Sequence, residues 1–104
     1  IVKVYRKKRN RMLQALQTYM PQEKELYWTE PKGGLFLWLS LPKQIDTEVL
    51  FPKAVAKKVA YIVGSAFHCD QSGKNTIRLN FSFPDEDQID EGIKRLAEVI
   101  KEAL

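Results

Sequence analysis

The residue with the clearest chemical potential is Arg78, in the alternating stretch NTIRLNFSF at residues 75–83. Apolar side chains occupy every second position of this stretch, and polar side chains, including Arg78 and Asn80, lie between them. A period of two predicts a half-buried β-strand with a guanidinium and an amide on its polar face. An arginine held on a strand offers a planar fork of N–H donors that matches a carboxylate or a phosphate. A structural ion pair, on the surface or between domains, is the alternative that this stretch alone leaves open.

Two adjacent glycines, Gly33 and Gly34, precede a strongly apolar stretch. Glycine tolerates positive φ and lets a ligand approach the backbone closely. The same pair also suits a simple hairpin turn, so on its own it indicates a turn rather than a site. Just beyond it, Phe36 and Trp38 are able to stack on a planar ligand, although packing in a core or between domains is the simpler interpretation.

His68, Cys69 and Asp70 form the second group of reactive side chains, in a polar segment at residues 66–74. Three consecutive residues rarely reach one ion together, so we predict no metal site. The only histidine and the only cysteine are direct neighbours, which places one poorly to activate the other. We therefore predict no nucleophilic cysteine chemistry here either.

Basic side chains crowd the first helical stretch, at Lys7, Lys8, Arg9 and Arg11. Such a run can contact phosphate, but a solvated helix face is the simpler interpretation. The formal net charge is +4, which is too small to indicate nucleic-acid binding by itself. The strands also lack the paired basic and aromatic residues of a nucleic-acid-binding sheet, so a small nucleic-acid-binding module is an alternative that the sequence disfavours.

The length and composition of the chain indicate one folded domain. A chain of 104 residues with 44% hydrophobic residues can bury one modest core. No signal peptide is visible, and no apolar run reaches the roughly 20 residues of a membrane span. A single cysteine excludes an intrachain disulfide and fits a reducing, cytoplasmic setting. Because the chain opens in a helical pattern without methionine or a capping residue, we interpret it as a fragment of a longer protein.

The periodicity predicts the elements that position these residues. Helices are expected over residues 1–20, 47–58 and 86–104, and strands over residues 25–30, 35–41, 59–63 and 75–83. The first two strands are expected to form an antiparallel hairpin. The order α-β-β-α-β-β-α predicts an α/β (α+β) fold, a two-layer sandwich in which helices cover a small, mostly antiparallel sheet.

Three local features sharpen this expectation. The strand at residues 35–41 is apolar on both faces, which predicts a central strand covered on both sides. Pro52 predicts a first turn at residues 47–51 and a regular helix beginning at the proline, with an apolar stripe of Val49, Leu50, Ala54 and Val55. Asp85 and Gln88 have the spacing of a capping box at the start of the last helix.

Five separated stretches resemble the C-terminal small domain of the fold-type I, class I/II aminotransferases, which depend on pyridoxal 5'-phosphate. They are YRKKRNRMLQAL (5–16), PKGGLFLWLSL (31–41), VAYIVGSAF (59–67), IRLNFS (77–82) and GIKRLA (92–97). The likeness covers nearly the whole chain, and it is strongest with the 2-aminoadipate and broad-specificity group and with related aminotransferase-like regulators. It implies that residues 1–104 form this small domain without the large cofactor-binding domain.

The resemblance also implies roles for single residues. Arg78 is expected to bind the substrate's α-carboxylate, Gly33 and Gly34 to lie in the loop that closes over the substrate, and Phe36 to border the pocket. The family usually has a proline where this chain has Val63, which alters the turn at Gly64 slightly. The Schiff-base lysine, the aspartate that pairs with the pyridinium nitrogen and the phosphate-binding groups belong to the family's large domain. The resemblance therefore implies no catalytic, cofactor-binding or metal-binding residue in this chain.

The implied parent is a homodimeric enzyme that transfers an amino group from an amino acid to a 2-oxo acid. Without the large domain, we expect this chain neither to bind pyridoxal phosphate tightly nor to transaminate, and we expect Arg78 to be solvated or to hold a stray anion. The alternative parent is a transcription regulator that uses the same fold as its effector half. A winged-helix DNA-binding domain encoded upstream would identify a regulator.

Overall fold

The computed structural model describes residues 2–31, 34–64, 73–82 and 84–104. The elements of this part follow the predicted order, and none of its helices is both long and apolar enough to cross a membrane. In chain order they are α1 (Val2–Tyr19), β1 (Tyr27–Trp28), β2 (Phe36–Ser40), α2 (Thr47–Ala56), β3 (Ile62–Val63), β4 (Thr76–Asn80) and α3 (Glu86–Ala103).

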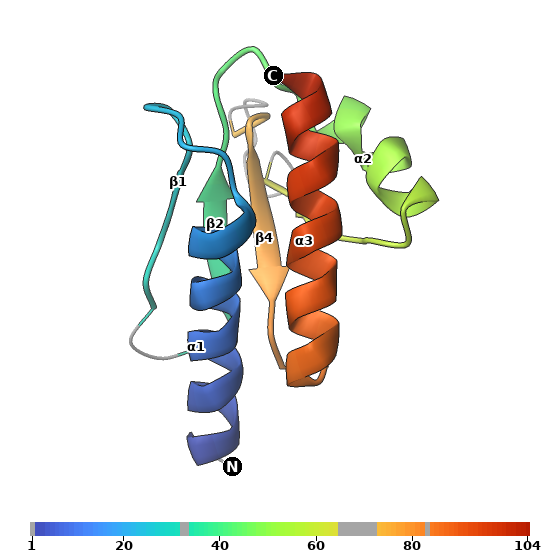
Figure 1. Ribbon diagram of the computed structural model, residues 1–104. Helices are drawn as coiled ribbons and strands as arrows, with labels where there is room; N and C mark the ends of the chain where they lie inside the picture. Colours follow the sequence, from blue (N-terminus) through green and yellow to red (C-terminus); the bar gives the residue numbers. More distant parts are fainter. Residues whose placement is uncertain (1, 32–33, 65–72, 83) are drawn as a thin grey trace.

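The four strands of the described chain form one sheet in the order β1-β2-β4-β3, and every neighbouring pair is antiparallel. Helices α1 and α3 contact each other and lie side by side over one face of β2 and β4, while α2 flanks the sheet (Figure 1). The predicted two-layer sandwich and its hairpin of β1 and β2 are confirmed.

The core lies between the sheet and the two long helices. Leu37 and Leu39 of β2 pair with Leu79 and Ile77 of β4, and all four side chains are buried. The helices add apolar stripes that are buried against this face, with Met12, Ala15 and Leu16 from α1 and Ile89, Ile93, Leu96, Ala97 and Ile100 from α3. Leu104, expected to continue the α3 stripe, is exposed at the chain end.

Helix α3 begins with the predicted capping box. The Asp85 carboxylate accepts from the Gln88 N–H at 2.7 Å, and the Gln88 side-chain oxygen accepts from the Asp85 N–H at 2.9 Å. One turn further, Asp90 accepts a hydrogen bond from the Tyr19 hydroxyl at 3.1 Å and lies 3.5 Å from the Arg11 guanidinium. The bond to Asp90 raises the pKa of the Tyr19 phenol. These contacts join the C-terminal half of α1 to the start of α3.

Two predictions about α2 are wrong. Helix α2 is continuous from Thr47 to Ala56 with Pro52 inside it, because the proline removes only one N–H donor and its ring is exposed. The helix buries Leu50 and Ala54, whereas Val49 and Val55 are 69% and 48% exposed, so its buried stripe is narrower than predicted.

Strand β2 is central, as predicted, but it is covered on one face only. Its side chains alternate between exposed or half-buried Phe36, Trp38 and Ser40 and fully buried Leu37 and Leu39. Both long helices pack on the same side, and no described element forms a third layer. Strands β1 and β3 are also shorter than expected, at two residues each.

Candidate functional site

Arg78 lies in the middle of β4, on the sheet face that α1 and α3 leave uncovered. The antiparallel register places Trp38 of β2 opposite it on one side and Ile62 of β3 on the other. Its guanidinium carbon stands 4.6 Å from the centre of the Phe36 ring, and its Nε atom is buried. The side chain is therefore half-buried rather than solvated throughout, and its guanidinium lies over an aromatic neighbour.

Phe36 and Trp38 belong to the same surface. Their ring planes are nearly perpendicular, at 87°, with centroids 6.2 Å apart, which is a favourable edge-to-face arrangement. Phe36 is 38% exposed, so it remains accessible to a ligand. Trp38 was interpreted from sequence as a packing residue, yet it shares the face of Arg78. The period of two had already indicated that Phe36 and Trp38 share a face, but not that this face also holds Arg78.

Gly34 leads into β2 with a φ of +81°, a conformation that glycine adopts without strain. A Cβ atom at Gly34 would meet nothing within 4 Å, so the backbone angle, rather than lack of space, favours glycine there. The following Leu35 carbonyl accepts from the Phe81 N–H at 3.0 Å, which ties this turn to the chain just after β4. Gly33 lies outside the described residues.

The second polar residue of the strand, Asn80, supports the chain around the site. Its side-chain oxygen accepts from the Ser82 N–H at 2.8 Å and from the Ser82 hydroxyl at 2.5 Å. The Lys8 ammonium donates to the Ser82 carbonyl at 3.1 Å, and the Arg9 guanidinium donates to the Pro31 carbonyl at 3.1 Å. These bonds connect α1 with the segments that follow β4 and precede β2.

The basic run of α1 is thus largely engaged within the chain. Lys8 and Arg9 donate to carbonyls, and Arg11 lies 3.5 Å and 3.7 Å from the carboxylates of Asp90 and Asp87. These contacts leave little of the run as a free phosphate-binding surface, which weakens the alternative of a nucleic-acid-binding module. The expected lack of paired basic and aromatic residues on the strands is wrong, however, because Arg78 lies 4.6 Å from the ring of Phe36, which is 38% exposed.

The other end of β4 is held by close backbone packing. A Cβ atom at Gly64 would overlap the Thr76 hydroxyl and lie 2.8 Å from the Thr76 carbonyl oxygen, so only glycine fits there. The Thr47 N–H donates to the Lys74 carbonyl at 2.7 Å, and its hydroxyl donates to the Thr76 carbonyl at 3.1 Å. The start of α2 and the end of β3 therefore fix β4 on the side away from Phe36.

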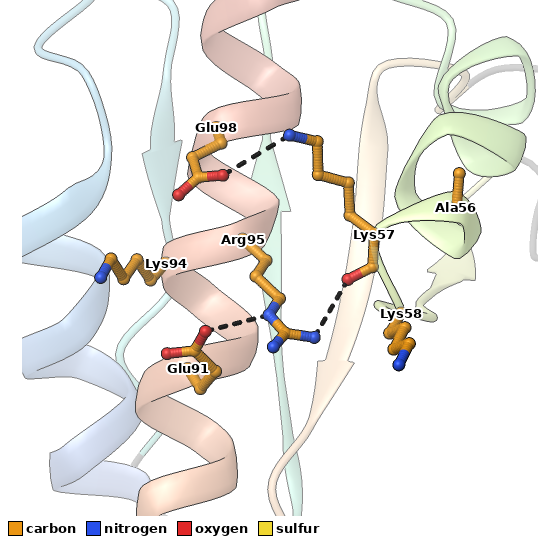
Figure 2. Close-up of a pocket in the computed structure, with 7 residues that line it drawn as sticks. All are labelled: Ala56, Lys57, Lys58, Glu91, Lys94, Arg95 and Glu98. Atoms are coloured by element: carbon orange, nitrogen blue, oxygen red, sulfur yellow. Dashed lines mark hydrogen bonds and ion pairs between the residues drawn. The ribbon is translucent and has the colours of Figure 1, made fainter.

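A charged hollow of about 340 Å³ between α2 and α3 is a weaker candidate. Arg95 donates to the Glu91 carboxylate at 3.0 Å and to the Lys57 carbonyl at 3.3 Å, and Lys57 lies 3.6 Å from Glu98. Lys94 points away from the other cations, across α3 (Figure 2). The charges are paired or divergent, so they do not form a common anion-binding site.

The described lysines differ from a lysine that holds a cofactor. Every described lysine is exposed except Lys8, which is half-buried and donates to Ser82, whereas a lysine that forms a Schiff base needs desolvation or a neighbouring cation. The described lysines therefore do not fit the role of cofactor anchor. In this part of the chain no three His, Cys, Asp or Glu side chains cluster for a metal ion, and residues 68–70 lie outside it.

Comparisons with known proteins identify the family to which the chain is similar. The model of the aminotransferase class I and II family matches residues 1–96. Aromatic-amino-acid aminotransferase 1 from Thermococcus litoralis is 50% identical over 104 residues, which are 100% of this chain and 24% of that protein.

Two solved structures extend the comparison. Pyrococcus horikoshii kynurenine aminotransferase is 50% identical, with a TM-score of 0.92 over 98% of this chain and 25% of its own. The alpha-aminoadipate aminotransferase of Thermus thermophilus, complexed with N-(5'-phosphopyridoxyl)-L-leucine, is 41% identical, with a TM-score of 0.89 over 96% of this chain and 25% of its own. The chain thus spans about a quarter of the length of these relatives.

A helix-turn-helix transcriptional regulator from Bacillus subtilis, itself uncharacterized, is also similar. It is 32% identical over 95 residues, which are 91% of this chain and 19% of the regulator. The similarity to regulators is therefore lower than the similarity to the aminotransferases.

Proposed function

Because this chain belongs to the aminotransferase class I and II family, we propose that it is the C-terminal small domain of a longer pyridoxal-phosphate-dependent aminotransferase. The longer protein transfers an amino group from an amino acid to a 2-oxo acid and assembles as a homodimer. Arg78 anchors the substrate's α-carboxylate. The placement of Arg78 on the helix-free face, beside two aromatic rings, is the observation that carries this proposal.

The chemistry of the guanidinium supports this role. Its N–H donors lie in one plane and match the two oxygens of a carboxylate, so a single bidentate contact defines both position and orientation. β4 is hydrogen-bonded on both sides, by β2 and β3, so the arginine stands on a rigid base. Such a base lets binding of the carboxylate orient the α-amino group for reaction.

Pyridoxal phosphate, when bound in the longer protein, supplies the electron sink for the amino-group transfer. The described residues of this chain do not fit as its binding site, since the lysines are exposed or bonded to a carbonyl. This chain therefore orients the substrate and depends on the remainder of the protein for the reaction itself.

The test of this function is Arg78→Ala in the longer protein, with L-phenylalanine and 2-phenylethylamine as amino donors. The amino acid carries the α-carboxylate and the amine lacks it. Removing one partner of a desolvated charge pair costs about 2–5 kcal/mol, so we expect a loss of roughly 30- to 5,000-fold in kcat/KM for L-phenylalanine. The rate with the amine changes little.

Arg95→Ala is the matched control, because Arg95 is engaged with Glu91 on the outer surface of α3. It is expected to leave both rates within about twofold of wild type, as is usual for an exposed pair. A loss below about tenfold for Arg78→Ala with the amino acid would contradict the proposed anchor.

The chain alone offers a second check. Mixed with pyridoxal phosphate, the 104-residue chain is expected to leave the absorbance spectrum of the cofactor unchanged and to show no transamination. A new, stable absorbance band would mean that the chain contains a cofactor-binding lysine after all.

The regulator relative supports one alternative parent. In that case the same face senses an amino acid without turning it over. Reading the coding sequence upstream of Ile1 distinguishes the two, because a winged-helix domain ahead of the large domain identifies a regulator.

A further inference from the structure

Phe36 touches the side chain that carries the proposed function, and we infer that it acts through that side chain. We propose that Phe36 is a positioning residue whose ring supports the Arg78 guanidinium and sets the plane in which its N–H fork meets a carboxylate. The inference rests on the proposed role of Arg78, and it changes the expected role of Phe36 from lining the pocket to orienting the anchor.

The contact between Phe36 and Arg78 joins diagonal neighbours in the sheet. The register places Trp38 directly opposite Arg78 and Phe36 opposite Asn80, so Phe36 is a diagonal neighbour of the arginine. Yet the guanidinium carbon lies over the Phe36 ring, 4.6 Å from its centre. Diagonal neighbours across a strand pair are within reach of aromatic and long side chains. The arginine therefore leans along the strand toward the Gly34 end of β2.

Phe36 is itself held in place. Its ring stands at 87° to the Trp38 ring, with 6.2 Å between the centroids. Trp38 pairs directly with Arg78 in the register, so both aromatic residues lie next to the arginine on the same face of β2. A rotation of the Phe36 ring would break its contacts with both neighbours.

A cation–π contact with Phe36 does not require the N–H donors of the guanidinium. The ring attracts the cation through its π face, and the N–H donors lie in the guanidinium plane. Phe36 thus restricts the orientation of the fork without using its donors. A preorganised fork loses less conformational freedom when a carboxylate binds, which strengthens binding.

The test is a double-mutant cycle in the longer protein with Phe36→Leu, Arg78→Ala and the combined variant. The kcat/KM for L-phenylalanine and the rate with 2-phenylethylamine are measured for each. A cation–π contact of this kind predicts a loss of about 3- to 30-fold for Phe36→Leu with the amino acid. With the amine as donor, Phe36→Leu is expected to change the rate by less than about twofold. In the Arg78→Ala background, Phe36→Leu is likewise expected to change kcat/KM by less than about twofold.

Two further variants separate positioning from folding. Phe36→Tyr keeps the ring face and is expected to restore kcat/KM to within about twofold of wild type. Phe51→Leu removes another half-buried aromatic ring, one that stacks on Tyr61 and lies away from Arg78, and is expected to leave kcat/KM unchanged. If Phe36→Leu does not fold, Phe36→Met, which also lacks a ring face, takes its place in the cycle.

Several results of the double-mutant cycle would overturn the proposed role of Phe36. If Phe36→Leu lowers the rate equally in the wild-type and Arg78→Ala backgrounds, or equally with the amine, Phe36 acts on the substrate or the fold and the inference is overturned. No loss from Phe36→Leu overturns it as well. A failure of the proposed function is visible separately, as a loss below tenfold for Arg78→Ala alone.

Discussion

Strands β2 and β4 show two faces with opposite properties. On one face, Leu37, Leu39 and Ile77 are fully buried under α1 and α3. On the other, Phe36, Trp38 and Arg78 are half-buried or exposed and contact one another, and no described helix or strand covers them.

The difference arises because successive side chains of a strand point to opposite sides. One pair of strands therefore supplies both the core and the candidate site. Substitutions on the covered face are expected to act on stability, and substitutions on the open face on ligand chemistry.

The largest expected effect on stability is a cavity in the covered face. Leu39→Ala removes a side chain with 0% exposure, and we expect the free energy of unfolding to fall by about 2–5 kcal/mol. Phe36→Ala, three residues earlier on the open face, is expected to cost roughly half of that or less, because the side chain is 38% exposed. Urea unfolding of both variants measures the difference. Equal losses would mean that the open face is packed as tightly as the covered one.

A smaller effect on stability is expected at Tyr61, which is buried beside α2. Its ring stacks edge-to-face with Phe51, and its hydroxyl donates to the Thr47 carbonyl at 2.6 Å. Tyr61→Phe removes this buried hydrogen bond, and we expect a loss of about 1–2 kcal/mol in the free energy of unfolding at neutral pH.

Tyr61 also predicts a dependence on pH. Burial, with a smaller contribution from the nearby Asp46 carboxylate, raises the pKa of the Tyr61 phenol above its ordinary value of 10.0. The unfolded chain therefore loses this proton at lower pH than the folded chain does. The stabilisation is complete below pH 10 and is lost as pH rises toward the folded-state pKa. Between pH 9 and pH 11, the midpoint temperature of thermal unfolding is expected to fall more steeply with pH for wild type than for Tyr61→Phe. Equal slopes for the two proteins would contradict this.

The smallest effect is expected where α3 begins. Asp85→Ala removes the carboxylate that accepts from the Gln88 N–H, and the loss of such a cap costs about 1 kcal/mol. Asp85→Asn keeps an acceptor and serves as the control. Because α3 covers only the buried face, kcat/KM in the longer protein is expected to stay near wild type, and a large loss would show that the two faces are coupled.

Much of the fold followed from local patterns. The period of two in β4 and the stripe of α3 up to Ile100 depend only on neighbouring residues, and the structure confirms both. Pro52 misled the prediction because the rest of α2 tolerates one missing hydrogen bond. The covering of β2 on both sides was predicted from its apolar composition, but composition does not reveal that both long helices pack on one face.

For the candidate site, the sequence by itself determined which side chains share a face within each strand, because alternation is a property of the strand alone. It also determined that Arg78 carries the donor fork, since the residue type defines that chemistry. The tertiary structure decided which ring meets the guanidinium. The register of β2 against β4 depends on packing between distant residues, and it brings Phe36, 42 positions away in the chain, to 4.6 Å from the Arg78 guanidinium carbon.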